Sequence, residues 1–265
     1  MGILLFPVGL GILLLSVAYV WLNFHRQVNR LRILMYHKVD PERMDMLTVS
    51  VPQLRQQLRY LQSAGYHFVS LQAVLADFTG TGPALPPRSV LLTFDDGYRN
   101  NLTYALPVLQ SFASPAVVFV PTAYIGKTNV WDGGTDPLMS VDELRHLSRH
   151  GVELAYHSHR HLNYKGLSAD QIGEDLLANL AAARQLDLPL LPAFAYPYGG
   201  RPKDLATYRG MEAAMKEGGI RLAFRIGNRI NSLPLRKPLE INRIDVRGTD
   251  SFALFKRKVR WGRLL

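Results

Sequence analysis

Residues 91–100 read LLTFDDGYRN and close an apolar run of the chain. The run from Val90 to Phe94 is apolar on both faces, which is typical of a parallel strand covered on both sides. Asp95 and Asp96 follow at once, although adjacent carboxylates repel each other, and Gly97 then weakens any regular element. A surface turn tolerates this pair at little cost, whereas a metal site or a proton-transfer site requires it.

Short apolar runs of this kind recur along the chain and alternate with stretches of helical periodicity. Strand–helix alternation repeated about seven or eight times predicts an α/β fold with a parallel sheet, either closed into a barrel or doubly wound. No glycine-rich phosphate loop follows the first strand, so a dinucleotide-binding fold has no positive support. The expected strands span residues 32–37, 67–70, 89–94, 116–120, 152–157, 192–196, 220–226 and 239–246.

Helical patterns fill the segments between these strands. Ser140 and Glu143 form a capping-box pattern, and Gly65 and Gly151 stand where helix C-caps belong. The irregular stretch 121–139 is long enough to be a functional loop after a strand. The expected helices span residues 52–64, 71–78, 101–113, 140–149, 168–187, 204–217 and 250–260.

The first 24 residues carry no charged side chain, and residues 3–22 are apolar apart from Ser16 and two glycines. About 20 such residues cross the hydrocarbon core of a bilayer as a helix. We therefore expect one transmembrane anchor in residues 1–24, followed by one large domain in residues 25–265. A cleaved signal peptide, with Ser16-Val17-Ala18 as its cleavage site, is the alternative, although no Lys or Arg precedes the apolar run.

The chain carries a formal net charge of +10, which favours acidic partners such as anionic lipid headgroups, nucleic acid or a charged glycan. Part of this charge lies in the C-terminal stretch FKRKVRWGRLL (255–265), which is either a solvated helix end or a second contact with membrane lipid. No nucleic-acid-binding motif is present, so we expect no nucleic-acid partner. Without cysteine the chain forms no disulfide bond.

Polar residues capable of chemistry stand at the ends of four predicted strands. The carboxyl ends of parallel barrel strands converge on one face, where enzymes of this architecture build their sites. Four such strand ends are hard to explain by packing, so we expect their side chains to meet. The residues are His37 after the first strand, Asp95 and Asp96 after the third, His157 after the fifth, and Tyr196-Pro197-Tyr198 after the sixth.

His157 and His161 lie in the stretch HSHRH, where a tight loop or one helical turn would aim both imidazoles at one ion. With the carboxylate of Asp96 they make a facial set for a divalent ion such as Zn²⁺, which leaves positions open for water and substrate. His159 lies between them and is expected to point elsewhere. A solvated, histidine-rich turn is the plain alternative, but Asp96 on a neighbouring strand end favours the metal site.

The acid pair then has two separate tasks. Asp96 is expected to bind the ion, and Asp95 is expected to accept a proton from the water that the ion activates. A protonated His37 across the site is the expected proton donor to a departing nitrogen. Gly97 would let the chain turn away sharply behind the two acids.

The motifs TFDDG (93–97) and HSHRH (157–161) resemble, in this order and spacing, the first two motifs of the polysaccharide deacetylases. This family, carbohydrate esterase family 4, shares the NodB-homology domain, and the resemblance covers roughly residues 31–246. It implies a distorted (β/α)7 TIM-like barrel that removes acetyl groups from glycans with a divalent metal.

The resemblance also implies roles for individual residues. Asp95 matches the catalytic base, and the metal ligands match Asp96, His157 and His161. FAYPYGG (194–200), which contains Pro197, is similar to the third motif of the family. There the backbone N–H of Tyr198 would help to hold a tetrahedral oxyanion, a task that fixed amides perform well.

Two departures from the family pattern concern the residues around the base. The third motif usually begins with an arginine that braces the catalytic aspartate, and Ala195 stands at that position here. We expect Arg243, near the end of the last strand, to replace it in space. The late Leu-x-His motif is missing, and LMYHKV (34–39) instead resembles the arrangement in deacetylases of poly-β-1,6-N-acetylglucosamine, with His37 as the acid.

These features predict a membrane-anchored, metal-dependent hydrolase that removes N-acetyl groups from amino sugars of a polysaccharide or lipid-linked glycan. Zn²⁺ is the expected ion, with Co²⁺ or Ni²⁺ as alternatives. Tyr98, Trp131 and Asp132 are the expected sugar contacts, and Trp131 suits this task best because aromatic faces match sugar rings. Two alternatives stay open: a non-catalytic glycan-binding module, which Ala195 would allow, and a metal-dependent deformylase or amidase for a small amide.

Charge and function predict different locations for the domain. Arg26, Arg30, Arg32 and Lys38 follow the apolar segment and precede the first acid, Asp40, so the positive-inside rule places the domain in the cytoplasm. Glycan deacetylation places it on the periplasmic or extracellular side of a bacterial-type inner membrane. In both cases the chain crosses the membrane once.

Overall fold

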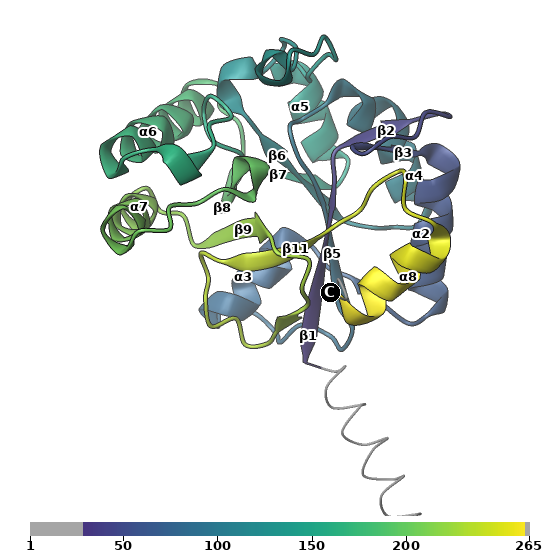
Figure 1. Ribbon diagram of the computed structural model, residues 1–265. Coiled ribbons are helices and arrows are strands. Elements are labelled where there is room, and N and C mark those ends of the chain that lie inside the picture. Colours follow the sequence, from purple (N-terminus) through teal and green to yellow (C-terminus); the bar gives the residue numbers. More distant parts are fainter. Residues whose placement is uncertain (1–28, 263–265) are drawn as a thin grey trace, which may run out of the picture.

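The computed structural model of the chain describes residues 29–262 (Figure 1). The transmembrane anchor or signal peptide predicted in residues 1–24 lies outside these residues, as do the last three residues of the basic C-terminus. Across residues 29–262, no helix is both long enough and apolar enough to span a bilayer.

Seven parallel strands close into a barrel, which decides between the two sheet arrangements that the alternation left open. Closure is made by β1 (Arg30–Tyr36), which pairs with β5 (Ser89–Phe94) on one side and β11 (Ile241–Asp245) on the other. The (β/α)7 barrel implied by the family resemblance is therefore confirmed. The other four strands are β6 (Ala116–Val120), β7 (Val152–Tyr156), β8 (Leu190–Ala195) and β9 (Leu222–Ile226).

The barrel is distorted where β5 meets its neighbours. The first residues of β5, Ser89 and Val90, pair with the short strand β4 (His67–Phe68). Only the stretch from Leu92 to Phe94 pairs with β6. β5 thus begins before its pairing with β6 does, and its first residues pair with β4 instead.

Helices surround the barrel (Figure 1), and six of the seven predicted ones begin and end within two residues of their expected bounds. The exception is the stretch 101–113, which begins as a π-helix, Asn101–Ala105. Pro107 has no amide hydrogen for the helical ladder, and the N–H of Leu106 reaches back five residues to the carbonyl of Asn101. The α-helices are α2 (Val51–Ser63), α3 (Leu71–Thr79), α4 (Leu106–Ser111), α5 (Val141–Arg149), α6 (Ala169–Gln185), α7 (Leu205–Glu217) and α8 (Phe252–Trp261).

Three very short strands were not predicted, because two or three residues are too few to show a hydrophobic period. β2 (Lys38–Asp40) and β3 (Thr48–Ser50) form a separate parallel pair after β1. β10 (Asn231–Ser232) pairs antiparallel with the first residues of β1. This last pairing ties the loop between β9 and β11 to the point where the chain enters the barrel.

The strands are apolar on both faces because both faces are covered. Leu31 and Ile33 of β1 point into the barrel, where they share a cluster with Phe224. Leu34 and Tyr36 alternate with them and belong to the cluster beneath the outer helices. All four side chains are fully buried, as expected for a parallel barrel strand.

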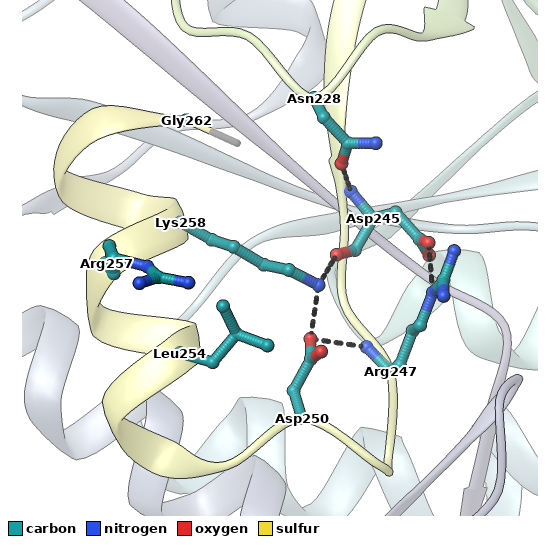
Figure 2. Close-up of a pocket in the computed structure, with 8 residues that line it drawn as sticks. All are labelled: Asn228, Asp245, Arg247, Asp250, Leu254, Arg257, Lys258 and Gly262. Carbon is teal, nitrogen blue, oxygen red and sulfur yellow. Dashed lines mark hydrogen bonds and ion pairs between the residues drawn. The ribbon is translucent and has the colours of Figure 1, made fainter. Parts of the chain in front are cut away.

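Buried ion pairs tie α8 to the end of β11 (Figure 2). Lys258 Nζ donates to Asp250 Oδ2 over 2.6 Å and to the carbonyl oxygen of Asp245 over 2.9 Å. The Asp245 carboxylate in turn accepts from Arg247 Nε, and the Asp245 N–H donates to Asn228 Oδ1 over 3.0 Å. Both acids of this pocket are thus paired within the fold, so we assign the pocket a structural role.

We expect Lys258→Met to lower the free energy of unfolding by about 3 kcal/mol, because it leaves Asp250 buried without its cation. Replacing both partners, Lys258→Met with Asp250→Asn, should recover part of this loss because no unpaired charge remains. Denaturant unfolding followed by circular dichroism measures both effects. A loss below about 1 kcal/mol in the single variant would show that the pair behaves like an exposed one.

Candidate metal centre

The carboxyl ends of the barrel strands meet as the sequence predicted. His37 directly follows β1, Asp95 and Asp96 follow β5, and His157 follows β7. Arg243 enters the same place from β11. The structure gathers these side chains at one end of the barrel, so the polar strand ends form one site.

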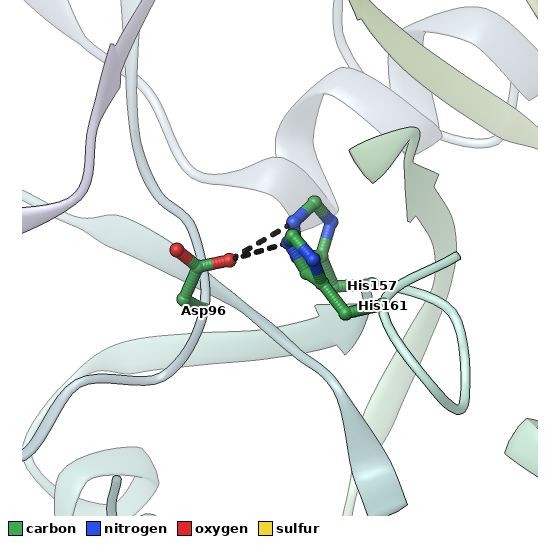
Figure 3. Close-up of side chains that lie close together, drawn as sticks. All are labelled: Asp96, His157 and His161. Atoms are coloured by element: carbon green, nitrogen blue, oxygen red, sulfur yellow. Dashed lines mark ion pairs between the residues drawn. The ribbon is translucent and has the colours of Figure 1, made fainter. Parts of the chain in front are cut away.

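Asp96, His157 and His161 converge on a single point (Figure 3). The Nε2 atoms of His157 and His161 lie 3.2 and 3.0 Å from Asp96 Oδ1. The donor atoms of the three residues all lie within 4.8 Å of one another, and all three residues are buried. Two imidazoles and one carboxylate in this arrangement are a ligand set for a divalent ion.

The hydrogen bonds of His157 test whether a cation fits this set. Its Nδ1 lies 2.8 Å from the carbonyl oxygen of Ala195, which can only accept, so Nδ1 carries a proton. In the neutral ring, Nε2 then carries a lone pair that faces Asp96. Asp96 Oδ1 is buried and has no well-formed hydrogen bond within the described chain. The lone pairs of His157 Nε2 and Asp96 Oδ1 would then repel each other, and a cation bound between the two atoms would replace this repulsion with attraction. The residues therefore fit a metal ion, with the Ala195 carbonyl fixing the ring.

The charges of the site are strongly coupled. Burial by itself raises the pKa of Asp96, but the two imidazoles hold that pKa well below its ordinary value. Burial likewise opposes protonation of His157, and the nearby carboxylates of Asp95 and Asp96 nevertheless raise its pKa. Both carboxylates are thus ionised at neutral pH, which is the form that binds a metal.

Backbone strain is concentrated at this centre. Asp96, Ser158, His161 and Tyr198 all have positive φ, at 73°, 64°, 53° and 58°. Non-glycine residues seldom adopt this conformation, and it costs of order 1–3 kcal/mol each where surrounding structure enforces it. Gly97, at φ 69°, provides the sharp turn that the sequence predicted. These backbone conformations orient the side chains of the proposed metal ligands. The sequence did not predict them.

Asp95 is held by Arg243 through two parallel hydrogen bonds. Arg243 Nη1 lies 2.5 Å from Asp95 Oδ1, and Nη2 lies 2.7 Å from Oδ2. Both side chains are buried, and the guanidinium also lies over the ring of Phe119. Burial would raise the pKa of Asp95, but the Arg243 charge lowers it below its ordinary value. Arg243 thus reaches the carboxylate that Ala195, a small side chain inside the barrel, cannot reach.

Asp175 is a supporting residue that the sequence reasoning missed. Its buried carboxylate, on α6, accepts from the N–H groups of His159 and Arg160 at 2.9 and 3.1 Å and from the Tyr164 hydroxyl at 2.9 Å. His159 points away from the metal ligands, with Nδ1 2.9 Å from Thr122 Oγ1. α6 therefore clamps the loop that carries both histidine ligands. The sequence did contain a signal for Asp175. The helical period of α6 places this acid on the buried face of the helix, beside Ile172, Leu176, Asn179 and Leu180.

Trp131, which was predicted to meet sugar, and Tyr198, which was predicted for its backbone amide, both contact the His161 ring. Trp131 stacks on the His161 ring with centroids 4.4 Å apart, and Tyr198 meets the same ring edge-on at 4.9 Å. The Tyr198 side chain is 51% exposed, and its hydroxyl donates to Asp132 Oδ1 over 3.1 Å. Pro197 is buried beneath this turn. Trp131, Asp132 and Tyr198 thus form one rim beside the metal centre.

Tyr98 was predicted as a sugar contact, and this prediction is wrong. Its side chain is fully buried beneath the long loop 121–139. The Tyr98 hydroxyl accepts from Asn129 Nδ2 over 3.2 Å, and Lys38 Nζ lies over its ring at 5.3 Å. The hydrogen bond from Asn129 connects Tyr98 to the loop 121–139, so Tyr98 has a structural role under this loop.

His37 is half-buried and lies near Asp95, where it adds a small contribution to the lowering of the Asp95 pKa by Arg243. It lies between β1 and β2. Around the barrel, β1 is next to β5 on one side, and β7, which leads into the histidine loop, lies on the other side of β5.

Comparison with known proteins identifies the family. The family description "Polysaccharide deacetylase" matches residues 82–216, which contain the acid pair, the histidine loop and the third motif. The chain belongs to the polysaccharide deacetylase family. The resemblance drawn from TFDDG and HSHRH is therefore confirmed.

Named relatives within the polysaccharide deacetylase family match only part of the chain. Poly-β-1,6-N-acetyl-D-glucosamine N-deacetylase of Escherichia coli (strain K12) is 39% identical over 84 residues, which cover 31% of this chain and 12% of that protein. The protein of the same name from Staphylococcus aureus (strain N315) is 28% identical over 141 residues, 52% of this chain and 47% of that protein. The chain therefore spans less than half the length of these relatives in the matched regions.

A solved structure matches the deacetylase fold over most of its length. The structure of IcaB from Ammonifex degensii superposes with a TM-score of 0.72 and 23% identity, covering 89% of this chain and 97% of that one. At this level of identity the match establishes the shared barrel.

Proposed function

We propose that this chain is a metal-dependent hydrolase that removes N-acetyl groups from amino sugars of a polysaccharide and releases acetate. The observation that supports it most is the buried set Asp96, His157 and His161 beside an ionised Asp95 that Arg243 holds in place. The relatives named poly-β-1,6-N-acetyl-D-glucosamine N-deacetylases favour a β-1,6-linked N-acetylglucosamine polymer as substrate. Trp131 and Tyr198 offer aromatic surface for its rings.

In the proposed mechanism, each residue has one task. Asp96, His157 and His161 would hold a divalent ion, with Zn²⁺ the best match and Co²⁺ or Ni²⁺ as alternatives. The chemistry that such an ion would supply is activation of water and polarisation of the acetamide carbonyl. Asp95 accepts the proton of the attacking water, because Arg243 keeps it ionised and aimed. The Tyr198 amide stabilises the oxyanion, and His37 gives a proton to the departing amine.

Two other functions are less well supported. A non-catalytic glycan-binding module would explain Ala195, but Arg243 supplies the brace that Ala195 lacks, and the base remains in place. A deformylase or amidase for a small amide would use the same metal chemistry. A rim that carries Trp131 and a half-exposed Tyr198 suits a sugar chain better than a small amide.

We further propose that residues 1–24 anchor the catalytic domain, residues 25–265, to a bacterial-type inner membrane, with a lipid-linked glycan as a second class of substrate. The support is the uncharged, apolar composition of residues 3–22. A glycan substrate favours the periplasmic or extracellular side. Protease accessibility of the domain in intact cells tests this orientation, and protection until the membrane is opened would place it in the cytoplasm.

Acetate release from β-1,6- and β-1,4-linked N-acetylglucosamine oligomers tests the proposed activity. The full chain would be assayed after chelation and after reloading with Zn²⁺, Co²⁺ or Ni²⁺. We expect metal to restore acetate release, faster from the β-1,6-linked oligomer. Bound metal without acetate release from either oligomer would argue for a small-amide substrate, and failure to bind metal would argue for the binding module.

Asp175→Asn is expected to weaken metal binding by about 10- to 100-fold, because a neutral amide holds the histidine loop less firmly than a carboxylate does. The metal dissociation constant, measured by competition with a chelator, reports this effect directly. Asp142→Asn, an exposed acid on α5, is the matched control and should leave the constant unchanged. Equal constants for Asp175→Asn and the unaltered chain would show that the loop keeps its shape without this clamp.

A further inference from the structure

A basic cavity lies away from the metal centre, beside β9, β10 and β11. Its volume is about 680 Å³. Four cations line it, namely Arg225, Arg229, Arg236 and Lys237, against a single acid, Glu240. Arg201 and Arg225 pair with Glu240 at 3.1 and 3.9 Å. The positive charge of the cavity therefore comes from Arg229, Arg236 and Lys237.

The cavity lies where the chain enters the barrel. Its strand β10 pairs with the first residues of β1, with Arg30 opposite Ser232. The N–H of Leu233 donates to the Asn29 carbonyl over 3.0 Å. Leu233 and Leu235 pack against the cluster inside the barrel, so their loop covers its amino-terminal end. Asp96 and His157, in contrast, follow the carboxyl-terminal ends of β5 and β7.

The last turn of α8 adds further positive charge and an aromatic ring to this end. Gly262 packs so closely on the cavity loop that a Cβ there would lie 3.4 Å from the Arg229 Cα. Arg32 Nε donates to the Val259 carbonyl over 2.8 Å, which holds the same turn against β1. Arg260 is exposed, and the Trp261 side chain is 53% exposed. An exposed indole among cations is typical of protein surfaces at a membrane–water boundary.

We propose that this basic end surface binds the phosphate headgroups of anionic phospholipids. Guanidinium groups match phosphate oxygens through paired hydrogen bonds, and the cavity provides several of them. Trp261 would sit at headgroup level beside them. The basic end surface is defined by Arg30, Arg225, Arg229, Arg236, Lys237, Arg260 and Trp261.

The sequence before the barrel supports a lipid rather than another phosphate compound. Residues 3–22 are apolar apart from Ser16 and two glycines, and the six residues 23–28 join this segment to Asn29. An extended chain spans at most about 3.5 Å per residue, so an apolar segment in a bilayer keeps the cavity within about 25 Å of the headgroups. The basic end surface would then face the bilayer, and the metal centre would face away from it, open to a long glycan. The inference uses the predicted anchor and does not depend on the proposed deacetylase activity.

A lipid titration tests this surface on the full chain in a neutral detergent. Short-chain phosphatidylglycerol and phosphatidylcholine with the same acyl chains would be added separately, with tryptophan fluorescence as the readout and Trp261→Phe to assign the signal. We expect saturable binding of phosphatidylglycerol only. Arg236→Glu with Lys237→Glu should weaken it by about tenfold or more, since each cation contributes to attraction by an anionic surface.

A control variant distinguishes the effect of the basic end surface from the effect of the net charge of the chain. Arg149→Glu with Lys216→Glu changes the charge of the chain equally, at exposed positions of α5 and α7. This control should bind phosphatidylglycerol like the unaltered chain. Equal binding of the two lipids, or equal weakening in both double variants, would overturn the proposal. Full competition by inorganic phosphate at millimolar concentration would overturn the lipid as the ligand and leave a free-phosphate site.

Discussion

Asp95→Asn is expected to slow acetate release by about 10²- to 10⁴-fold while the chain still binds its metal. The reason is that asparagine keeps the shape of the side chain but cannot accept the proton of the attacking water. The ligands Asp96, His157 and His161 are unchanged, so metal stoichiometry should stay the same. Steady-state rates on an N-acetylglucosamine oligomer and metal analysis of the same samples give the two numbers.

Two companion variants make this result specific. Asp96→Asn should lose activity together with metal, since it removes the only carboxylate among the three ligands. Asp142→Asn, at an exposed acid on α5 outside the site, should keep metal and the activity. If Asp95→Asn kept full activity, Asp95 would not be the catalytic base, and its hydrogen bonds with Arg243 would have a structural role only.

Arg243→Met is expected to lower the free energy of unfolding by about 3–5 kcal/mol and to reduce the rate strongly. The variant leaves the Asp95 carboxylate buried at 3% exposure without the guanidinium that pairs with it. Removing that cation also raises the Asp95 pKa toward the value that burial alone would give. Chemical unfolding at neutral pH and the pH profile of the rate measure both consequences.

The sign of the pH effect follows from the depressed pKa of Asp95. A carboxylate with a lowered folded-state pKa stabilises the fold above its unfolded-state pKa, and this contribution is lost as pH falls through the folded-state pKa. The stability difference between Arg243→Met and the unaltered chain should therefore be largest above the raised Asp95 pKa of the variant and should shrink as pH falls from there through the lowered Asp95 pKa of the unaltered chain.

The control is Arg201→Met, which breaks a partly exposed pair with Glu240 outside the site. It should cost less than about 1 kcal/mol, because solvent screens both charges. Equal losses in Arg243→Met and Arg201→Met would contradict a special role for the buried pair.

Much of the fold was predictable because parallel strands that are buried on both faces appear in the sequence as continuous apolar runs. β5 and β6 are read almost to the residue from the runs SVLLTF and AVVFV. Closure of the barrel was not decided by this pattern, because a doubly wound sheet covers its strands in the same way. The pairing of β1 with both β5 and β11 decides it, and such pairing depends on residues some 60 and 210 positions apart.

The site was predictable where it depends on strand ends and not where it depends on loop geometry. Asp95, Asp96 and His157 follow strands directly, so the topology alone brings them together. The clamp by Asp175 and the left-handed conformations at Ser158 and His161 arise from tertiary contacts with no local sequence preference. Tyr98 failed as a surface residue because an aromatic side chain after a strand packs equally well under a loop.

Anomalous diffraction at the zinc edge, from crystals of the chain grown with Zn²⁺, tests the proposed metal centre. We expect one strong peak about 2.0–2.2 Å from a carboxylate oxygen of Asp96 and from one imidazole nitrogen each of His157 and His161. The peak should be absent from crystals of Asp96→Asn grown in the same way. Zinc bound elsewhere, with no density among these three side chains, would show that they do not form the metal site.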